Sequence, residues 1–384
     1  MKHIYLDYAS TTPMDSRVLK AMLPFFSGNF ENPSSIYSGG IEAKEAIDFS
    51  RAKIAKFLTC SPDEIIFTSG GTESDNLAII GILKKFKKGH VISSIIEHPA
   101  VYEACKRLET EGFKVTYLKP DKDGIISANQ IKRALRKDTI LVSIMYANNE
   151  IGTIQPIKEI SKVICKWKME NKYPLFHTDA CQATLYLPMD VKELGVDLLS
   201  FNGSKIYGPK GIGVLFKKSN IEIEPQIVGG QQENGYRAGT ENVPSIVGLA
   251  KAVEIISTKK AQNEKLLRDY LISKLIKIEG ITINGSTKRR LPNNVNFSIK
   301  GIEGESVLLD LNHQFVAVST GSACSSRDLK PSRVITAISG EVAAHGSIRV
   351  TIGRSTQKSE IDIFLKVLKK TINRFRQMSP YGRS

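Results

Sequence analysis

The sequence has few cysteines, and their spacing excludes the commonest uses of that residue. The five cysteines lie at positions 60, 105, 165, 181 and 324; they form no CxxC pair and no Cys/His spacing that would build a zinc site. An odd number of cysteines in a chain without a secretion signal indicates reduced thiols. The first residues, MKHIYLDYAS, lack a basic segment followed by an apolar one, and no apolar run approaches the length that spans a bilayer. We therefore expect a soluble, cytoplasmic protein without a membrane segment or a metal site.

The charge is strongly one-sided, but it is not gathered into a nucleic-acid surface. The 384-residue chain has a formal net charge of +15, and basic surfaces attract phosphates. The basic clusters are scattered over 83–90, 131–138, 286–291 and 368–376, mostly on stretches whose helical periodicity indicates solvated helix faces. The sequence has no basic strand with interleaved aromatic residues that could stack bases. Direct nucleic-acid binding is therefore not expected, and docking of an acidic protein or a tRNA is a weaker alternative to catalysis.

Composition and periodicity predict an α/β protein. Hydrophobic residues make up 41% of the sequence and charged residues 24%, which is typical of a globular protein with a large core. Between about residues 60 and 250, short apolar runs alternate with helical patterns, which is typical of βαβ units and a mostly parallel sheet. Short strands and helices follow, closed by an amphipathic helix over about 358–377. We predict a large domain at 14–255, with helices flanking the sheet, and a small α+β domain formed by 1–13 and 256–384.

Polar residues follow the predicted strands at the points where these strands end. EIIFT runs into SGGTES, HVISSII into EHPA, TILVSIMY into ANNEIG, PLFHT into DACQA, and VDLLSF into NGSK. The carboxyl ends of parallel strands form the ligand-binding edge of such a sheet. We therefore predict that one site gathers the side chains of Thr72, His98, Asn149, Asp179, Gln182 and Lys205.

Each of these residues also has an ordinary structural explanation. The Gly-Gly-Thr of SGGTES suits a turn and a helix N-cap, although such glycines equally let backbone amides cradle a phosphate. His98 can be a half-buried histidine, Asn149 a turn former and Lys205 a solvated loop lysine. Asp179 is harder to explain in this way, because a carboxylate at the end of a buried strand costs free energy unless a cation meets it.

Taken together, these groups match the needs of pyridoxal phosphate. A lysine holds the aldehyde of this cofactor as a Schiff base, and a carboxylate keeps its pyridine nitrogen protonated. A phosphate cradle, a flat histidine against the ring and amide side chains near the phenolic oxygen complete the set. We therefore predict that Lys205, in GSKIYGPKG, is the Schiff-base lysine of a pyridoxal-phosphate enzyme.

Cys324 differs from the other cysteines in its surroundings. The others lie in apolar stretches typical of small core residues, whereas Cys324 lies in STGSACSSRD, a run of small polar residues that indicates an exposed loop. A thiol in such a loop is expected to be reactive rather than packed.

Motifs along nearly the whole chain then point to a known family. They are, in order, YLDYASTTP (5–13), NPSS (32–35), TSGGTESDN (68–76), EHPA (97–100), NNEIG (148–152), HTDACQA (177–183), GSKIYGPKGIG (203–213), RAGTENV (237–243), GSACSS (321–326) and SIRVTIGR (347–354). In this combination the sequence resembles the cysteine desulfurases of the class V aminotransferase family, within the fold type I pyridoxal-phosphate enzymes. The resemblance implies conversion of L-cysteine to L-alanine, with the sulfur passing through a persulfide on the enzyme.

The resemblance also implies a role for each matched position. Lys205, His98 and Cys324 are implied to be catalytic, as the cofactor-binding lysine, the ring-stacking acid/base group and the sulfur-accepting nucleophile. Asp179 is implied to meet the pyridinium nitrogen, with Gln182 and Asn149 near the phenolic oxygen. The other implied contacts are Gly71, Thr72, Asn202 and Ser204 at the phosphate, Thr240 at the phosphate of the other subunit of a homodimer, and Asn32 and Arg349 at the substrate.

Two positions depart from the pattern of the family. Its commonest form has Ser-x-His before the lysine, where this chain has Asn202, Gly203 and Ser204, and a histidine often follows NPSS where this chain has Tyr37. Asn202 and Ser204 still offer hydrogen-bond donors to a phosphate. The chain ends soon after its last helix, whereas family members that dock an iron–sulfur scaffold commonly carry a longer tail. The shorter tail argues against docking of that scaffold in the usual way. A tRNA-thiolating enzyme or a different iron–sulfur scaffold is therefore expected as the sulfur acceptor.

Two other functions compete with this hypothesis. The first is another pyridoxal-phosphate enzyme of the same fold, such as an aminotransferase or a selenocysteine lyase, for which Cys324 would be incidental. The second is a basic adaptor without catalysis, for which neither Lys205 nor Asp179 would be needed.

Overall fold

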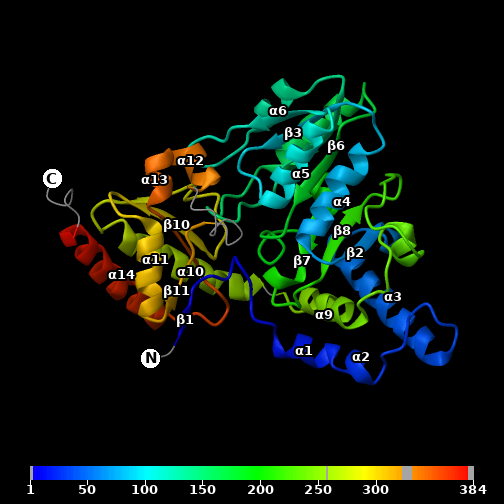
Figure 1. Ribbon diagram of the computed structural model, residues 1–384, viewed down its shortest axis with the longest axis horizontal. Coiled ribbons are helices and arrows are strands. Elements are labelled where there is room, and N and C mark those ends of the chain that lie inside the picture. The colour runs from blue at the N-terminus through cyan, green and yellow to red at the C-terminus, as the bar shows by residue number, and fades with distance from the viewer. Residues whose placement is uncertain (1–2, 257, 322–330, 379–384) are drawn as a thin grey trace.

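The central element of the structure is a seven-stranded sheet, which occupies the right half of Figure 1. The computed structural model describes residues 3–256, 258–321 and 331–378. The strand order is β2-β8-β7-β6-β5-β3-β4, and β8 is antiparallel to both of its neighbours whereas the other pairs are parallel. These strands are β2 (Ile65–Thr68), β3 (His90–Ser94), β4 (Lys114–Leu118), β5 (Thr139–Ser143), β6 (Leu175–Asp179), β7 (Leu198–Asn202) and β8 (Gly213–Lys217). The predicted mostly parallel sheet is therefore confirmed.

Both faces of this sheet are covered by helices. Successive residues of a strand point to opposite faces, so a strand buried on both sides is apolar throughout. In β7, Leu199 and Phe201 lie in one core and Leu198 in the core on the other face. On the face of Leu199 and Phe201, the covering helices are α3 (Ser38–Leu58), α6 (Ala128–Ala134), α7 (Ile157–Lys168) and α9 (Val243–Glu254). On the face of Leu198, they are α4 (Gly71–Leu83) and α5 (Pro99–Thr110).

A second core lies beside this unit, in the left half of Figure 1. It is built on an antiparallel sheet of order β12-β10-β9, whose strands are β9 (Ile281–Ile283), β10 (Asn294–Ile299) and β12 (Ser347–Thr351). The covering helices are α10 (Thr258–Leu275), α11 (Gly304–His313) and α14 (Lys358–Met378). The position of α14 confirms the predicted amphipathic helix.

The beginning of the chain lies with these C-terminal elements. β1 (Ile4–Tyr5) pairs in parallel with β11 (Val316–Ala317), and the Thr351 N–H donates to the Leu6 carbonyl at 2.8 Å. This is the arrangement expected of a small domain that contains residues 1–13, although the boundaries between the domains stay a prediction.

The remaining helices are short. They are α1 (Ser16–Met22), α2 (Pro24–Ser27), α8 (Val191–Leu194), α12 (Arg333–Ser339) and α13 (Glu341–His345). Over the three described ranges, no helix combines the length and the apolar composition that crossing a membrane requires. The cytoplasmic location stays a prediction.

The helix after β2 begins earlier than its hydrophobic pattern indicates. The apolar run predicts a helix opening near Asp75, but α4 begins at Gly71, and the Ser74 N–H donates to the Gly70 carbonyl at 3.1 Å. Gly70 is therefore the N-cap, Gly71 and Thr72 belong to the first helical turn, and the backbone N–H groups of this turn lie at the carboxyl edge of the sheet.

Candidate active site

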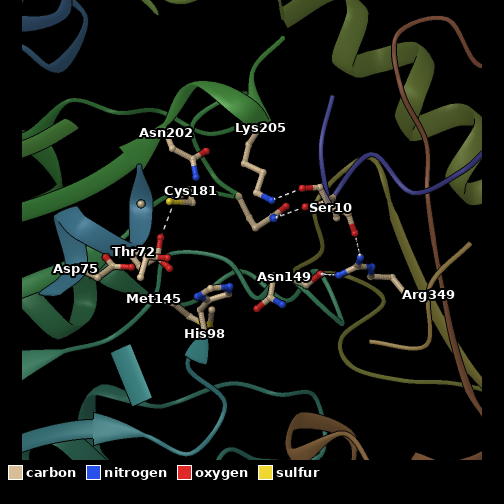
Figure 2. Close-up of a pocket in the computed structure, with 14 residues that line it drawn as sticks. Ser10, Thr72, Asp75, His98, Met145, Asn149, Cys181, Asn202, Lys205 and Arg349 are labelled. Atoms are coloured by element: carbon tan, nitrogen blue, oxygen red, sulfur yellow. Dashed lines mark hydrogen bonds between the residues drawn. The ribbon is translucent and has the colours of Figure 1, made fainter. Parts of the chain in front are cut away.

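A cavity at the carboxyl edge of the central sheet gathers most of the predicted residues. It is lined by all six residues predicted from the strand ends, together with Gly71, Asn202 and Arg349. Figure 2 shows that the labelled side chains among them come from separate elements and point toward one space; these are Thr72, His98, Asn149, Asn202, Lys205 and Arg349. The prediction that the strand ends form one site is therefore confirmed as a matter of geometry.

The N-terminus of α4 forms one wall of this cavity. The first N–H groups of a helix have no intrahelical partner and carry the positive end of its dipole, so they favour an anion. A methyl group on Gly71 would lie 2.6 Å from the Cys181 Sγ and 3.1 Å from the Asn202 Nδ2, so the close approach requires glycine. Thr72 borders both the cavity and an adjoining depression that Ser204 also lines.

Asp179 places a carboxyl group at the end of β6. Its side chain is almost fully buried, and its Oδ1 accepts a hydrogen bond of 2.9 Å from the Cys181 N–H. A buried carboxylate is stable only where cations and N–H donors compensate for lost hydration. The other carboxylate oxygen is therefore suited to a cationic group bound in the cavity.

Lys205 enters the cavity from the turn after β7. Its Nζ donates to the Ser10 carbonyl at 2.5 Å. Thr12 fixes the turn, because its N–H and its hydroxyl both donate to the Ser204 carbonyl at 2.9 Å, and its hydroxyl accepts from the Tyr207 N–H at 2.8 Å. The lysine is thus held by the N-terminal segment rather than left in a solvated loop.

His98 is the N-cap of α5, and its Nδ1 accepts from the Ala100 N–H at 3.1 Å. This bond assigns the ring proton to Nε2. Burial lowers the pKa of His98 below its ordinary value, while the neighbouring Asp179 opposes the shift. The histidine is therefore neutral near pH 7 and offers an N–H from Nε2.

Arg349 reaches the cavity from β12 of the second core. Its guanidinium donates to the Asn149 carbonyl at 2.9 Å and to both the Asp7 Oδ1 and the Ser10 Oγ at 2.8 Å. Its Nε is buried and has no hydrogen-bond partner within the described part of the chain. An unsatisfied N–H beside a cavity is the group that a substrate carboxylate can satisfy.

Two predicted residues lie away from the cavity, and a third is not among the described residues. Asn32 is exposed, and its Oδ1 accepts from the Ser34 N–H at 2.9 Å. Thr240 is also exposed and borders a separate depression with Arg237 and Glu241. Cys324 lies outside the described residues. The roles given to these three residues stay predictions.

Sequence reasoning missed the contribution of the N-terminal segment. The Ser10 carbonyl accepts from Lys205 and its hydroxyl from Arg349, while the Ala9 carbonyl accepts from the Gln182 Nε2 at 3.0 Å. The available signal was YLDYASTTP, whose small polar residues follow a short strand. That signal does not show which distant side chains the segment contacts.

The residues present fit pyridoxal phosphate. The cavity combines an anion cradle that only glycine can line, a buried carboxyl group, a lysine and a neutral imidazole. These are the groups that the phosphate, the pyridine nitrogen, the aldehyde and the ring face of this cofactor each require.

Comparisons with known proteins agree with the site. The model of the family "Aminotransferase class-V" matches residues 4–364. The chain is 50% identical to a cysteine desulfurase IscS of Dictyoglomus turgidum, over 99% of this chain and 97% of that protein. It is 48% identical to a cysteine desulfurase IscS of Methanosarcina thermophila, over 99% of this chain and 94% of that protein.

Solved structures show the same similarity. A NifS-like protein superposes with a TM-score of 0.90 at 36% identity, covering 97% of this chain and 100% of its own. A structure titled SspA in complex with cysteine superposes with a TM-score of 0.82 at 39% identity, covering 91% and 98%. The chain therefore belongs to the class V aminotransferase family, with the fold of the type I pyridoxal-phosphate enzymes. Within this family it is a pyridoxal-phosphate-dependent cysteine desulfurase.

Replacing Gly71 tests the phosphate cradle. A Gly71→Ala side chain would collide with Cys181 and Asn202, and such overpacking costs about 1–3 kcal/mol. We expect the dissociation constant of pyridoxal phosphate to rise roughly 5- to 150-fold, measured by absorbance titration of the apo-protein. Lys84→Ala, exposed at the other end of α4, is the control. An unchanged affinity in the Gly71 variant would remove the cradle from this site.

Proposed function

We propose that the cavity converts L-cysteine to L-alanine and that Cys324 receives the sulfur as a persulfide. The observation that carries the proposal is Arg349, which lines one cavity with Lys205 and Asp179 and whose buried Nε has no hydrogen-bond partner within the described ranges. A substrate with an α-carboxylate can satisfy this N–H and so place its α-carbon toward the lysine. The full-length similarity to cysteine desulfurases supports the same substrate.

Each cofactor contact follows from the groups already described. Lys205 would hold the aldehyde, Asp179 the pyridine nitrogen, and His98 one face of the ring. Gln182 has one Nε2 hydrogen left beyond its bond to Ala9, and with Asn149 it would reach the phenolic oxygen. The phosphate would lie against Gly71, Thr72, Asn202 and Ser204. When bound, pyridoxal phosphate supplies an electron sink that acidifies the α-proton of the amino acid.

The protein side chains then orient the substrate and move its protons. Arg349 fixes the carboxylate, so that the α-hydrogen faces the Lys205 amine, which takes this proton. The Nε2–H of His98 serves as a hydrogen-bond donor, because its Nδ1 is already occupied by the Ala100 N–H. Asp7 and Ser10 keep the guanidinium in place while the substrate binds and leaves.

Sulfur transfer needs a thiolate that can approach the sulfur of the substrate. In this step the Cys324 thiolate forms the S–S bond as the bond between the substrate sulfur and its β-carbon breaks, and the carbon takes up a proton to give alanine. Cys181 is a poor rival, because burial and the neighbouring Asp179 raise the pKa of its thiol well above the ordinary value. A thiol held protonated is a weak nucleophile.

The persulfide must lose its outer sulfur before the enzyme can turn over again. We propose an acceptor protein, either an iron–sulfur scaffold or a tRNA-thiolating enzyme. The formal charge of +15 favours an acidic surface on that acceptor.

A homodimer is proposed from the exposed apolar side chains near the N-terminus. Apolar patches of this kind mark interaction surfaces in soluble proteins. The side chains belong to α1, α2, α3 and the segment before α3, and are Leu19, Leu23, Phe26, Phe30, Ile36, Ile41 and Phe49. Thr240 lies outside the cavity of its own chain, which leaves it available to the phosphate of a second subunit.

Replacing Arg349 tests carboxylate recognition. A hydrogen bond to a charged group contributes about 1.5–3 kcal/mol, so Arg349→Ala should lower kcat/KM for L-cysteine at least about tenfold. Bound cofactor, measured by visible absorbance, should remain. The control is Arg289→Ala, whose side chain is about half exposed. Unchanged kinetics in Arg349→Ala would assign the substrate carboxylate to another residue.

Replacing the two cysteines tests the assignment of the nucleophile. In Cys324→Ser, L-cysteine should still change the visible spectrum, because cofactor chemistry needs no protein thiol, but alanine and persulfide should not accumulate catalytically. Cys181→Ala should keep substantial activity. Mass spectrometry should find the added sulfur on the STGSACSSR peptide of the wild-type protein. Sulfur on the Cys181 peptide, together with an active Cys324→Ser variant, would contradict the proposal.

Charging the apolar surface tests the dimer. Phe26→Asp adds a carboxylate to a side chain that is 59% exposed on α2, whereas the control Val342→Asp adds one to a side chain that is 83% exposed on α13. We expect sedimentation to show a dimer for the wild type and the control, and dissociation for Phe26→Asp. A fully active wild-type monomer would be incompatible with shared sites.

A further inference from the structure

A second aspartate, Asp75, lies at the cavity and has no role in the chemistry described so far. It belongs to the second turn of α4, its side chain is 1% exposed, and it lines the same cavity as Asp179. Figure 2 shows it beside Thr72, on the wall that α4 contributes. Its Oδ1 is buried and has no hydrogen-bond partner among the residues that the structure describes. An ionised carboxylate in this position would leave most of its lost hydration uncompensated.

The nearest basic group does not supply a positive charge. The His177 Nε2 lies 3.6 Å from the Asp75 Oδ1. Both ring nitrogens of His177 are already within hydrogen-bond distance of hydroxyls, Nδ1 at 2.9 Å from the Ser143 Oγ and Nε2 at 3.0 Å from the Ser200 Oγ. Burial lowers the pKa of His177 to about 4. This histidine is therefore neutral near pH 7 and does not form an ion pair with Asp75.

The other titratable groups that face Asp75 are acidic. They are Asp179 at the end of β6 and Glu97 before α5, and burial raises the pKa of Glu97 to about 8, so that Glu97 is largely uncharged near pH 7. The neighbouring Ser200 hydroxyl of β7 opposes the rise in the pKa of Asp75. Glu97 accepts from the Ser94 hydroxyl at 2.6 Å and from the Met145 N–H at 3.1 Å. Burial first, and then Asp179, raise the pKa of Asp75 well above its ordinary value.

The two aspartates of the cavity have opposite surroundings. Asp179 accepts a backbone N–H from Cys181 and shares the cavity with Lys205 and His98. Among the residues that the structure describes, the polar groups around Asp75 are the Ser200 hydroxyl, the neutral imidazole of His177 and two acids. Pairs of acids whose environments differ in this way take different protonation states, and the neutral partner can donate a hydrogen bond.

We propose that Asp75 is a neutral carboxylic acid in the folded enzyme and is a positioning residue for Asp179. It places a second carboxyl group beside Asp179 without adding a second negative charge. Asp179 is then left as the partner of the pyridine nitrogen, with no second negative charge beside it. The role of Asp179 in this inference rests on the proposed function, whereas the protonation of Asp75 does not.

The protonation state is tested in the apo-protein, where the cofactor plays no part. A carboxyl whose pKa is higher in the folded than in the unfolded protein costs stability as the pH rises above the unfolded value of about 3.9, because only the unfolded chain ionises. Asp75→Asn removes this titration. Between about pH 5 and pH 7, the ratio of the wild-type to the Asp75→Asn unfolding constant should therefore rise up to about tenfold per pH unit, measured by urea denaturation.

The design separates the slope from any packing defect. A poorly packed amide changes the ratio of unfolding constants by the same factor at every pH, so it does not change how this ratio varies with pH. If Asp75→Asn folds poorly, Asp75→Leu replaces it, because leucine cannot titrate either and the ratio should rise with pH in the same way. Asp63→Asn, which removes an exposed carboxyl, is the control and should give no comparable slope. A ratio that is independent of pH, or that falls as the pH rises, would overturn the neutral state of Asp75.

The positioning role is tested in the loaded enzyme by the pH profile of the visible spectrum. Because an amide can donate a hydrogen bond as the neutral acid does, Asp75→Asn should keep the wild-type profile, whereas Asp75→Leu should shift it. Equal shifts in both variants, or none in either, would overturn the positioning role. If the ratio of unfolding constants rises with pH in the apo-protein as expected, but the wild-type protein binds no cofactor, only the proposed function is contradicted.

Discussion

Burial of the Asp179 side chain at the end of β6 is the constraint that the neighbouring groups satisfy. A carboxylate removed from water needs N–H donors and positive charge around it. The Cys181 N–H supplies one donor, and Lys205 lies in the same cavity. His98, neutral by burial, can lie beside these charges without adding another. The parallel sheet makes this possible, because it brings the ends of strands far apart in sequence to one edge.

The N-terminal segment joins the two cores at this edge. Its short strand pairs with β11 on the side of the second core, and the residues that follow contact the turn after β7 of the central sheet. Ser10 accepts hydrogen bonds from both Lys205 and Arg349, so one residue fixes the relation between the lysine and the arginine. Because Arg349 comes from β12, substrate recognition depends on how the second core lies against the first.

Part of this arrangement can be predicted from the sequence, and the reason is local. Strand ends followed by glycine or by polar residues are visible as patterns, and parallel topology then brings Lys205, Asp179 and His98 together without further information. Asp75 could not be predicted in this way. It lies in TESDN at the polar beginning of a helix, where an aspartate is ordinarily solvated, and it is buried because α4 packs against the strands of the central sheet and against α5. The contacts of Asp7 and Ser10 depend on pairing over more than three hundred positions, through the pair of β1 with β11 and the bridge between Asp7 and Thr351 at the end of β12. Asn32 and Thr240 lie outside the cavity of the single chain, so their predicted roles depend on a second subunit or on a rearrangement.

Lys205 is proposed to be the residue that bonds to pyridoxal phosphate beside Asp179, and the other proposed roles depend on this bond. Borohydride reduction of the loaded protein converts the linkage between a lysine amine and the cofactor aldehyde into a stable bond, and digestion followed by mass spectrometry locates it. We expect the added mass on the peptide that contains Lys205. The same mass on a peptide containing Lys210 or any other lysine, with Lys205 unmodified, would contradict this assignment.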